Sequence, residues 1–291
     1  MEIIDGKKLR DQILLKVKEG VKALTFQPVF CDVLVGEDPA SMQYVEMKAR
    51  TAEMVGIHFH QAHFPASIST SDLIKEIQIL NKMPNMCGII VQLPLPVSID
   101  KKAILDSIDS HLDVDCLGVA ASEKFYNNYD NKTDLGYPTA LACMALLDFI
   151  NYDFTHKVVV VLGQGDLVGK PVSTLLHGRN IMYIPVNSKT ENKEYLLQTA
   201  DVVISGIGKA KFITGNKIKL GAVLIDAGTS EDAGSPLGDK KNIVGDVDLE
   251  SVRNIASYVS PVPGGVGPVT VAMLLNNVLK VAQSRASQKL K

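Results

Sequence analysis

Runs of apolar residues alternate along the chain with stretches whose apolar positions recur at helical spacing. Residues 29–35 (VFCDVLV) and 87–93 (CGIIVQL) indicate buried strands, and residues 56–64 alternate as a strand does. Residues 41–55 and 71–83 are predicted helices, the second with Ser71 as its N-cap. The residues expected to share one face of the first helix are Met42, Val45, Ala49, Ala52 and Val55. Strand–helix alternation of this kind is typical of a parallel sheet covered by helices.

The same rhythm restarts in the second half of the chain after a polar segment, residues 121–135, which we expect to be a domain boundary. A helix is predicted at 139–150 and another at 270–286, where the pattern ends. The strands expected between them are residues 157–162, 182–186, 202–205 and 222–226. The pattern therefore predicts an α/β protein, and its length of 291 residues fits two domains.

Composition narrows the class of protein. The formal net charge is −2, so no basic excess favours binding to nucleic acid or to an anionic membrane surface. No window approaches the roughly 18 consecutive apolar residues of a membrane span, and the first residues lack the apolar core of a signal peptide. The four cysteines are far apart, which indicates neither a disulfide framework nor a metal site. We therefore expect a cytoplasmic protein without a structural metal.

Three glycines follow the strand at 157–162, and the sequence there reads LGQGDLVGKP. Gly163, Gly165 and Gly169 allow a backbone to approach a pyrophosphate at the start of a helix, although their GxGxxxG spacing differs from the dinucleotide fingerprint GxGxxG. A tight turn without a ligand is the alternative. Two later strands end in SGIG (205–208) and DAGT (226–229), at the edge where open parallel sheets bind ligands.

Polar residues in the first half offer a second kind of site. Tyr44 and Lys48 are four residues apart and share a helical face, and Gln92 ends an otherwise apolar strand. Asp113 and Asp115 form a DxD pair. Each has an ordinary alternative: a solvated lysine, a glutamine bonded to nearby backbone, or an acidic loop in water.

The segment SPVPGGVGPVT, residues 260–270, has three prolines and three glycines in eleven residues and precedes a helix. Such density predicts a rigid loop with close backbone approach, and a ligand-facing loop explains it better than a plain linker.

Together these motifs resemble the bifunctional methylenetetrahydrofolate dehydrogenase/cyclohydrolase family. The similarity rests, in the family's order, on GEDPASMQYVEMK, GIIVQLPLP, LDVDC, GQGDLVGKP, NSKT, DAGT, GDV and PVPGGVGPVT. It implies two domains flanking a cleft: a folate-binding catalytic domain of residues 1–138 plus 262–291, and a Rossmann-like dinucleotide-binding domain of residues 139–261. It also implies a homodimer formed through the dinucleotide domains, tetrahydrofolate derivatives as substrates, and NADP as cofactor, with NAD as the second possibility.

The resemblance also implies roles for individual residues. Lys48 is expected to be the catalytic lysine, with Tyr44 stacking on the folate and Gln92 bonded to Lys48. Asp115 is expected to bind the pterin. The full substrate-binding set is Ser41, Tyr44, Val91, Gln92, Leu93, Asp115, Pro263, Gly264 and Gly265. The cofactor-binding set is Gly163, Gln164, Gly165, Ser188 and Thr229.

Four departures from the family's motifs stand out. Gln164 replaces the arginine that helps to hold the 2′-phosphate of NADP, so we expect weaker discrimination against NAD. Asn187 replaces a histidine before Ser188, and Leu112 and Cys116 replace a lysine and a glycine around Asp115. The family's Pro-Cys-Thr-Pro reads YPTA at 137–140 and retains only the threonine.

Three other functions would each fit part of the sequence. A dehydrogenase with little cyclohydrolase activity and a catalytically silent folate- or dinucleotide-binding protein are both disfavoured, because Tyr44, Lys48 and Gln92 are all retained. An unrelated two-domain α/β oxidoreductase leaves VQLPLP and PVPGGVGP unexplained.

Overall fold

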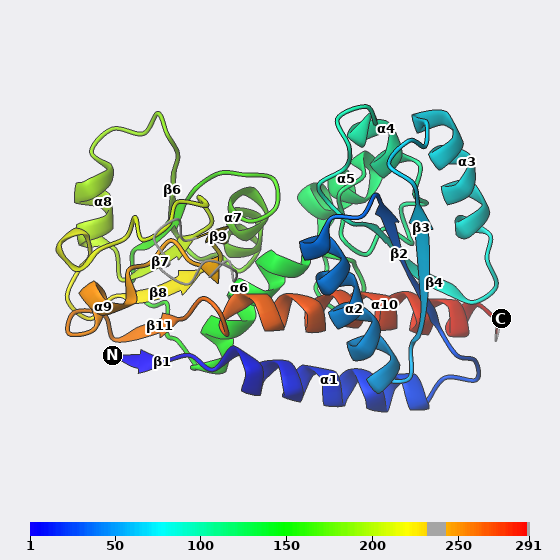
Figure 1. Ribbon diagram of the computed structural model, residues 1–291. Helices are drawn as coiled ribbons and strands as arrows, with labels where there is room; N and C mark the ends of the chain where they lie inside the picture. Colours follow the sequence, from blue (N-terminus) through cyan, green and yellow to red (C-terminus); the bar gives the residue numbers. More distant parts are fainter. Residues whose placement is uncertain (232–242, 290–291) are drawn as a thin grey trace. The chain divides into compact units, whose positions relative to one another are not determined.

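The computed structural model describes residues 1–231 and 243–289, and the chain divides into two compact units (Figure 1). The first consists of Met1–Asp11 and Thr139–Thr270 and is called here the six-stranded unit after its sheet. The second consists of Gln12–Pro138 and Val271–Lys291 and is called the three-stranded unit.

The three-stranded unit is built on a parallel sheet with strand order β3–β2–β4. Its strands are β2 (Val29–Val35), β3 (His58–Phe64) and β4 (Met86–Val91). The helices that fall wholly or largely within it are α1 (Gly6–Lys22), α2 (Pro39–Met54), α3 (Thr70–Asn81), α4 (Lys101–Asp106), α5 (Val119–Asn128) and α10 (Val266–Lys289). Every residue of β2 and β4 is buried, as expected for strands covered on both faces.

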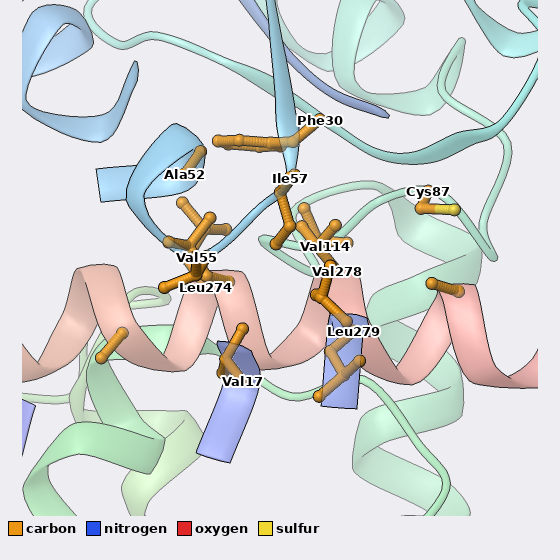
Figure 2. Close-up of a cluster of buried hydrophobic side chains, with 14 of the residues drawn as sticks. Val17, Phe30, Ala52, Val55, Ile57, Cys87, Val114, Leu274, Val278 and Leu279 are labelled. Carbon is orange, nitrogen blue, oxygen red and sulfur yellow. The ribbon is translucent and has the colours of Figure 1, made fainter. Parts of the chain in front are cut away.

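Two apolar clusters cover the two faces of this sheet. In one, Phe30 of β2 packs with Val17 of α1 and with Leu274 and Val278 of α10 (Figure 2). In the other, Cys31, Val33 and Val35 of β2 pack with residues of α3 and α4. Because side chains alternate along a strand, Asp32 is expected on the Phe30 face.

The six-stranded unit has the strand order β1–β11–β8–β7–β5–β6, and every neighbouring pair is parallel. The strands are β1 (Glu2–Ile3), β5 (Val159–Leu162), β6 (Tyr183–Val186), β7 (Val202–Ser205), β8 (Val223–Asp226) and β11 (Tyr258–Ser260). A short antiparallel pair, β9 (Ser230–Glu231) with β10 (Ile243–Val244), lies apart from this sheet. The helical segments are α6 (Pro138–Phe149), α7 (Gly169–Gly178), α8 (Lys193–Thr199), α9 (Leu249–Val252) and a 3₁₀ turn, Gly215–Lys217. This doubly wound parallel sheet confirms the predicted fold class.

Most predicted elements agree with the structure within a few residues, and the strands at 29–35 and 202–205 match at both ends. The prediction for the N-cap of α3 was wrong, because Ser69, not Ser71, accepts the bond from the N–H of Asp72. On α2, Met42 is exposed, and the buried face consists of Ser41, Val45, Lys48 and Ala52.

The polar segment 121–135 is more ordered than its composition suggests. Its first part belongs to α5, and the buried ring of Phe125 contacts the rings of Tyr126, Tyr129 and Tyr137 at centroid distances of 4.8–5.4 Å. The first eleven residues, expected with residues 12–138, lie in the six-stranded unit, because β1 pairs with β11. In the two described ranges, no helix combines the length and the apolar character that crossing a membrane requires.

Candidate active site

Lys48 is buried in the three-stranded unit, with only 1% of its surface exposed. It lies on α2, which starts at Pro39 after the N-cap Asp38, whose carboxylate accepts a 2.7 Å bond from the N–H of Ser41. A buried ammonium must be paired or hydrogen-bonded, because leaving water costs it several kcal/mol. The partners of Lys48 therefore define the site.

Two side chains from neighbouring strands meet the amine of Lys48. Oδ2 of Asp32, in β2, lies 2.5 Å from Nζ, and Oε1 of Gln92, directly after β4, accepts a 2.8 Å bond from Nζ. The amide of Gln92 also donates to the carbonyl of Leu93 at 2.9 Å. The ring of Tyr44 completes the group, with Nζ 4.8 Å from its centroid, within the range of a cation–π contact.

The predicted side-by-side placement of Tyr44, Lys48 and Gln92 is thus present. Tyr44 retains 39% exposure. Withdrawal of its hydroxyl from water raises its pKa to about 12, and the negative charges of Asp115 and Asp32 add to the effect. Tyr44 is accordingly a neutral ring, partly accessible to solvent, beside the amine of Lys48.

Asp32 was not predicted, although the sequence carried a sign of it. It is the one ionisable carboxyl in the strand VFCDVLV, and its exposure is 0%. An acid in a fully buried strand requires a buried partner. That partner is Lys48, sixteen positions later, and the helical spacing of α2 alone gave no indication that its lysine faces inward.

Asp115 lies in the tight loop between α4 and α5, which contacts β4. Asp113 forms an isolated bridge to Ile89 of β4 and accepts a 2.7 Å bond from the N–H of Gly118. Asn277 of α10 donates to the carbonyl of Val114 at 2.8 Å. The loop is thereby fixed to the sheet and to α10.

Both carboxyls of this loop resist ionisation. Desolvation raises the pKa of Asp113 to about 6. Desolvation likewise raises the pKa of Asp115 to about 7, with Lys48 opposing the shift and the charges of Asp113 and Asp32 adding to it. Asp115 therefore belongs to the same electrostatic group as Lys48, and it can accept or donate a hydrogen bond near neutral pH.

The remaining predicted substrate residues of this unit frame the group. Ser41 lies one turn before Tyr44 on α2 and is buried, Val91 is the buried last residue of β4, and Leu93 is half-buried before a cis bond to Pro94. Seven predicted residues thus share one unit: Ser41, Tyr44, Lys48, Val91, Gln92, Leu93 and Asp115.

A second group of predicted residues lies at the carboxyl ends of strands in the six-stranded unit. Gly163 follows β5 with φ +94°, and an added Cβ there would meet Ile207 at 2.9 Å. A Cβ on Gly169, at the start of α7, would lie 1.9 Å from the carbonyl oxygen of Gly163. Gly165 has open space around it. Two of the glycines thus form the turn, and the third leaves room at the N-terminus of α7, where an anion is favoured.

Gln164, Ser188 and Thr229 lie along the same sheet edge, after β5, β6 and β8. The amide of Gln164 folds back on its own turn and donates to the carbonyls of Val161 and Gly163. Ser188 and Thr229 are exposed. The loop that carries Ser188 is closed by Thr190, whose hydroxyl accepts a 2.9 Å bond from the N–H of Asn187.

Two buried carboxylates below this edge were not predicted. Asp226, at the end of β8, accepts from the N–H groups of Gly228, Asp246 and Val247 at 2.8–3.0 Å. Asp246 accepts from the hydroxyl of Ser205 and from the N–H groups of Ile207 and Lys209 at 2.7–2.9 Å. Burial raises the pKa of Asp226 to about 6. The pair joins the loops after β7 and β8 to the segment before α9.

The loop Pro263–Gly265 follows β11, so it belongs to the six-stranded unit with the cofactor residues and not to the unit of Lys48. Gly264 has φ +111°, and the N–H of Gly265 donates to the carbonyl of Pro261 at 2.7 Å. A Cβ on Gly265 would lie 2.7 Å from that same oxygen, so the tight turn requires this glycine. Across residues 1–231 and 243–289, no three His, Cys, Asp or Glu side chains gather as metal ligands would.

The chain matches two family models. Residues 4–115 match the tetrahydrofolate dehydrogenase/cyclohydrolase catalytic domain, and residues 137–286 match the NAD(P)-binding domain of the same family. The first match contains Lys48 and its partners, and the second contains the glycine turn.

Individual relatives and solved structures are similar to this chain over nearly its whole length. The bifunctional protein FolD of Moorella thermoacetica is 42% identical over 286 residues, which cover 97% of this chain and 99% of that protein. The crystal structure of FolD from Campylobacter jejuni superimposes with a TM-score of 0.91 at 34% identity, covering 98% and 99% of the two chains. That of Trypanosoma brucei FolD, complexed with NADP cofactor and inhibitor, has a TM-score of 0.90 at 34% identity and 97% coverage of both chains. The chain belongs to the tetrahydrofolate dehydrogenase/cyclohydrolase family.

Proposed function

We propose that this protein oxidises 5,10-methylenetetrahydrofolate with NADP and hydrolyses the resulting 5,10-methenyl compound to 10-formyltetrahydrofolate. The observation that carries the proposal is the buried amine of Lys48, held by Asp32 and Gln92 beside the ring of Tyr44. A lysine positioned in this way can act as a general acid or base. It also lies within the region that matches the family's catalytic domain.

The six-stranded unit is proposed to hold the dinucleotide. The residues fit it, because the space at Gly165 and the N-terminus of α7 offer a site for a pyrophosphate. When bound, the dinucleotide supplies the hydride acceptor. Ser188 and Lys189 follow β6 and offer a hydroxyl and a positive charge for a 2′-phosphate, and that strand end carries no acid for a free ribose 2′-hydroxyl. NADP is therefore proposed over NAD.

The substrate contacts are proposed from the family's motifs together with the chemistry of each side chain. Asp115 accepts hydrogen bonds from the amino-pyrimidinone edge of the pterin, and the ring of Tyr44 stacks on the folate. Ser41, Val91 and Leu93 line the same region. Pro263, Gly264 and Gly265 are assigned to the folate site from the motif PVPGGVGP alone. For the oxidation, these residues contribute position and not proton transfer.

Hydrolysis of the methenyl bridge needs a proton carrier. Water adds to the cationic bridge carbon, and the bond from that carbon to N5 must then break, which is easier when N5 receives a proton. Lys48 is the proposed donor. Asp115 is the other side chain of this group whose pKa, about 7, lies near neutral pH. We assign it to substrate binding and not to proton transfer.

Two properties of the whole molecule complete the proposal. We infer a homodimer formed through the dinucleotide domain, on the basis of the family resemblance, and sedimentation velocity tests it. We also infer a cytoplasmic enzyme, and the four free, buried cysteines are compatible with a reducing compartment.

The decisive experiment is the variant Lys48→Met. The purified enzyme, methylenetetrahydrofolate and NADP should give reduced nicotinamide, followed by its absorbance, and methenyltetrahydrofolate should be hydrolysed. Lys48→Met should lower the hydrolysis rate by about 100-fold or more, the range of acid–base groups, and affect hydride transfer less. A near-normal hydrolysis rate in this variant would contradict the role of Lys48.

Because Lys48→Met leaves the carboxylate of Asp32 buried without its partner, the variant is destabilised, by about 3–5 kcal/mol on the scale of broken buried pairs. The double variant Lys48→Met, Asp32→Leu removes both charges and serves as the folded control. It should recover stability but not hydrolysis, which separates loss of chemistry from loss of structure.

A further inference from the structure

Asp32 is a buried carboxylate whose placement the binding of folate does not explain. It lies in the middle of β2, between the apolar residues Cys31 and Val33, and none of its surface is exposed. Oδ2 contacts Nζ of Lys48, and no described residue donates a hydrogen bond to Oδ1. Every other residue of this strand is apolar.

Stability is a poor explanation for this ion pair. Replacing a buried ion pair with well-packed apolar residues is often neutral or stabilising, because two charges must be desolvated to form the pair. What the pair changes is the charge of the amine. A buried amine without an anion favours its neutral form, whereas a carboxylate 2.5 Å away favours the ammonium.

We propose that Asp32 is a positioning residue for the hydrolytic step, which keeps Lys48 protonated and fixed between Gln92 and Tyr44 so that Lys48 acts as a proton donor. The inference rests on the proposed function and extends it to the protonation state of the lysine. It also assigns a role to a residue that none of the recognised motifs includes.

The hydrolytic step moves protons between water, the substrate and Lys48. Water adds to the cationic bridge carbon and releases one proton to solvent, leaving a neutral carbinolamine. The bond between that carbon and N5 breaks as N5 takes a proton from Nζ of Lys48. The hydroxyl of the carbinolamine becomes the formyl carbonyl, and its proton returns to Lys48. One proton is released overall, and Asp32 takes no part in the transfers; burial raises the pKa of its carboxyl, and the adjacent Lys48 opposes that shift.

The groups that surround the pair determine how the proposal is tested. Burial raises the pKa of Cys31 and that of Tyr44, so both remain neutral between pH 6 and 8.5. Asp115, in the loop between α4 and α5, interacts electrostatically with both members of the pair, and its pKa of about 7 lies inside that range. Gln92 is uncharged. A rate profile alone therefore contains the ionisation of Asp115, and a direct measurement on Lys48 is needed beside it.

The first measurement is the hydrolysis of methenyltetrahydrofolate between pH 6 and 8.5, corrected for the uncatalysed rate. Without Asp32 the amine loses its proton at lower pH, so the variant loses its donor as the pH rises. Asp32→Asn should be about tenfold or more slower than the wild type at pH 8 and within about threefold of it at pH 6. Dehydrogenase activity should change by less than about threefold at both values. Equal loss of both activities at all pH values would indicate a structural role only and overturn the proposal.

The second measurement observes the lysine without using activity. In protein labelled with ¹⁵N at lysine Nζ, the signal absent from Lys48→Met reports Lys48. In the wild type it should keep an ammonium shift up to pH 8.5, and in Asp32→Asn it should move to the amine value within the range. A wild-type signal that titrates in the same way as the variant overturns the proposal. If the wild type hydrolyses nothing, the proposed function fails, yet this measurement still tests the pair.

A second substitution covers the case in which Asp32→Asn does not fold. Asp32→Leu removes the charge and all hydrogen-bonding atoms and suits an apolar strand, so it should fold and show the same pH-dependent loss. In the double variant with Lys48→Met, neither substitution at position 32 should slow hydrolysis further, because the effect acts through Lys48. A further loss in the double variant contradicts that route.

Discussion

The backbone N–H of Asp246 donates a 3.0 Å hydrogen bond to Oδ1 of Asp226, so the residue that organises one loop is itself held by the end of the neighbouring strand. The carboxylate of Asp246 in turn accepts three bonds, from Ser205 at the end of β7 and from Ile207 and Lys209 in the segment that follows. A Cβ on Gly228 would lie 2.2 Å from the carboxylate of Asp246, so the loop after β8 also packs closely on this group. The shape of the loops at the carboxyl edge of the six-stranded sheet, where we propose that the dinucleotide binds, thus depends on Asp246.

Asp246→Asn should therefore weaken dinucleotide binding while sparing the activity that needs no dinucleotide. The amide keeps one acceptor oxygen but turns an N–H₂ group toward donors, and hydrogen bonds to charged groups contribute about 1.5–3 kcal/mol each. We expect KM for NADP to rise about tenfold and cyclohydrolase activity to remain within about twofold. Asp153→Asn, an exposed acid in the loop before β5, is the control and should change neither. A parallel fall of both activities would point to general loss of structure instead.

The glycines of the turn after β5 should divide into two kinds. Gly169→Ala places a methyl group 1.9 Å from a backbone oxygen, so the turn must open, and we expect a loss of stability of about 2 kcal/mol or more. Gly165→Ala meets no protein atom within 4 Å, so its stability should change little. Any rise of KM for NADP in Gly165→Ala then reports a ligand in that space. Thermal unfolding and initial rates on both variants check this, and equal melting temperatures would disprove the division.

Cofactor preference should depend on Gln164 and Ser188. Gln164→Arg introduces a cation whose hydrogen bonds to a phosphate contribute about 1.5–3 kcal/mol, so the ratio of kcat/KM for NADP over NAD should rise by about tenfold to a hundredfold. Ser188→Ala removes an exposed hydroxyl after β6 and should lower the ratio. Steady-state kinetics with both cofactors measure this. A wild type that prefers NAD by about tenfold would refute NADP as the main cofactor.

Asp115→Asn should stabilise the protein at pH 8 and weaken substrate binding. The folded-state pKa of Asp115, about 7, lies above the ordinary value of 3.8. The folded state therefore binds a proton more readily than the unfolded state, and stability falls as pH rises from about 4 through 7. The loss of folding stability caused by ionised Asp115 is complete above the folded-state pKa and absent below pH 4.

The amide removes that penalty, so its unfolding free energy should exceed the wild-type value by about 1–3 kcal/mol at pH 8 and match it near pH 4. Urea titrations at both pH values test the difference. KM for the folate should rise in both activities, because Asp115 is assigned to binding. A stability gain that is the same at both pH values would show that ionisation is not its cause.

Features that depend on local sequence could be predicted well. The strand of Val29–Val35 and the helical spacing that puts Tyr44 beside Lys48 follow from residues close together in the chain. The amphipathic helix Gly6–Lys22 went unpredicted, because its charged residues obscure the buried positions Leu14, Val17 and Val21.

Contacts between distant residues could not be derived in this way. The bond between Lys48 and Gln92 joins positions 44 residues apart, and it was expected only from the family resemblance. Asp32 and Asp246 were missed because their partners come from other elements, and periodicity does not report which helix a buried acid faces. The burial of Lys48 likewise depends on its strand partners and not on α2.

The position of helix α10 in the chain affects when the three-stranded unit can fold during synthesis. Its residues Ala272–Ala282 contribute to the apolar cluster that contains Phe30, whereas the six-stranded sheet uses the first residues of the chain through β1. A break between residues 138 and 139 would therefore leave each fragment without a segment that its own unit requires. During synthesis, the three-stranded unit cannot complete its core until residues 272–282 have left the ribosome, so we expect it to finish folding only after the intervening residues 139–270 have been synthesised.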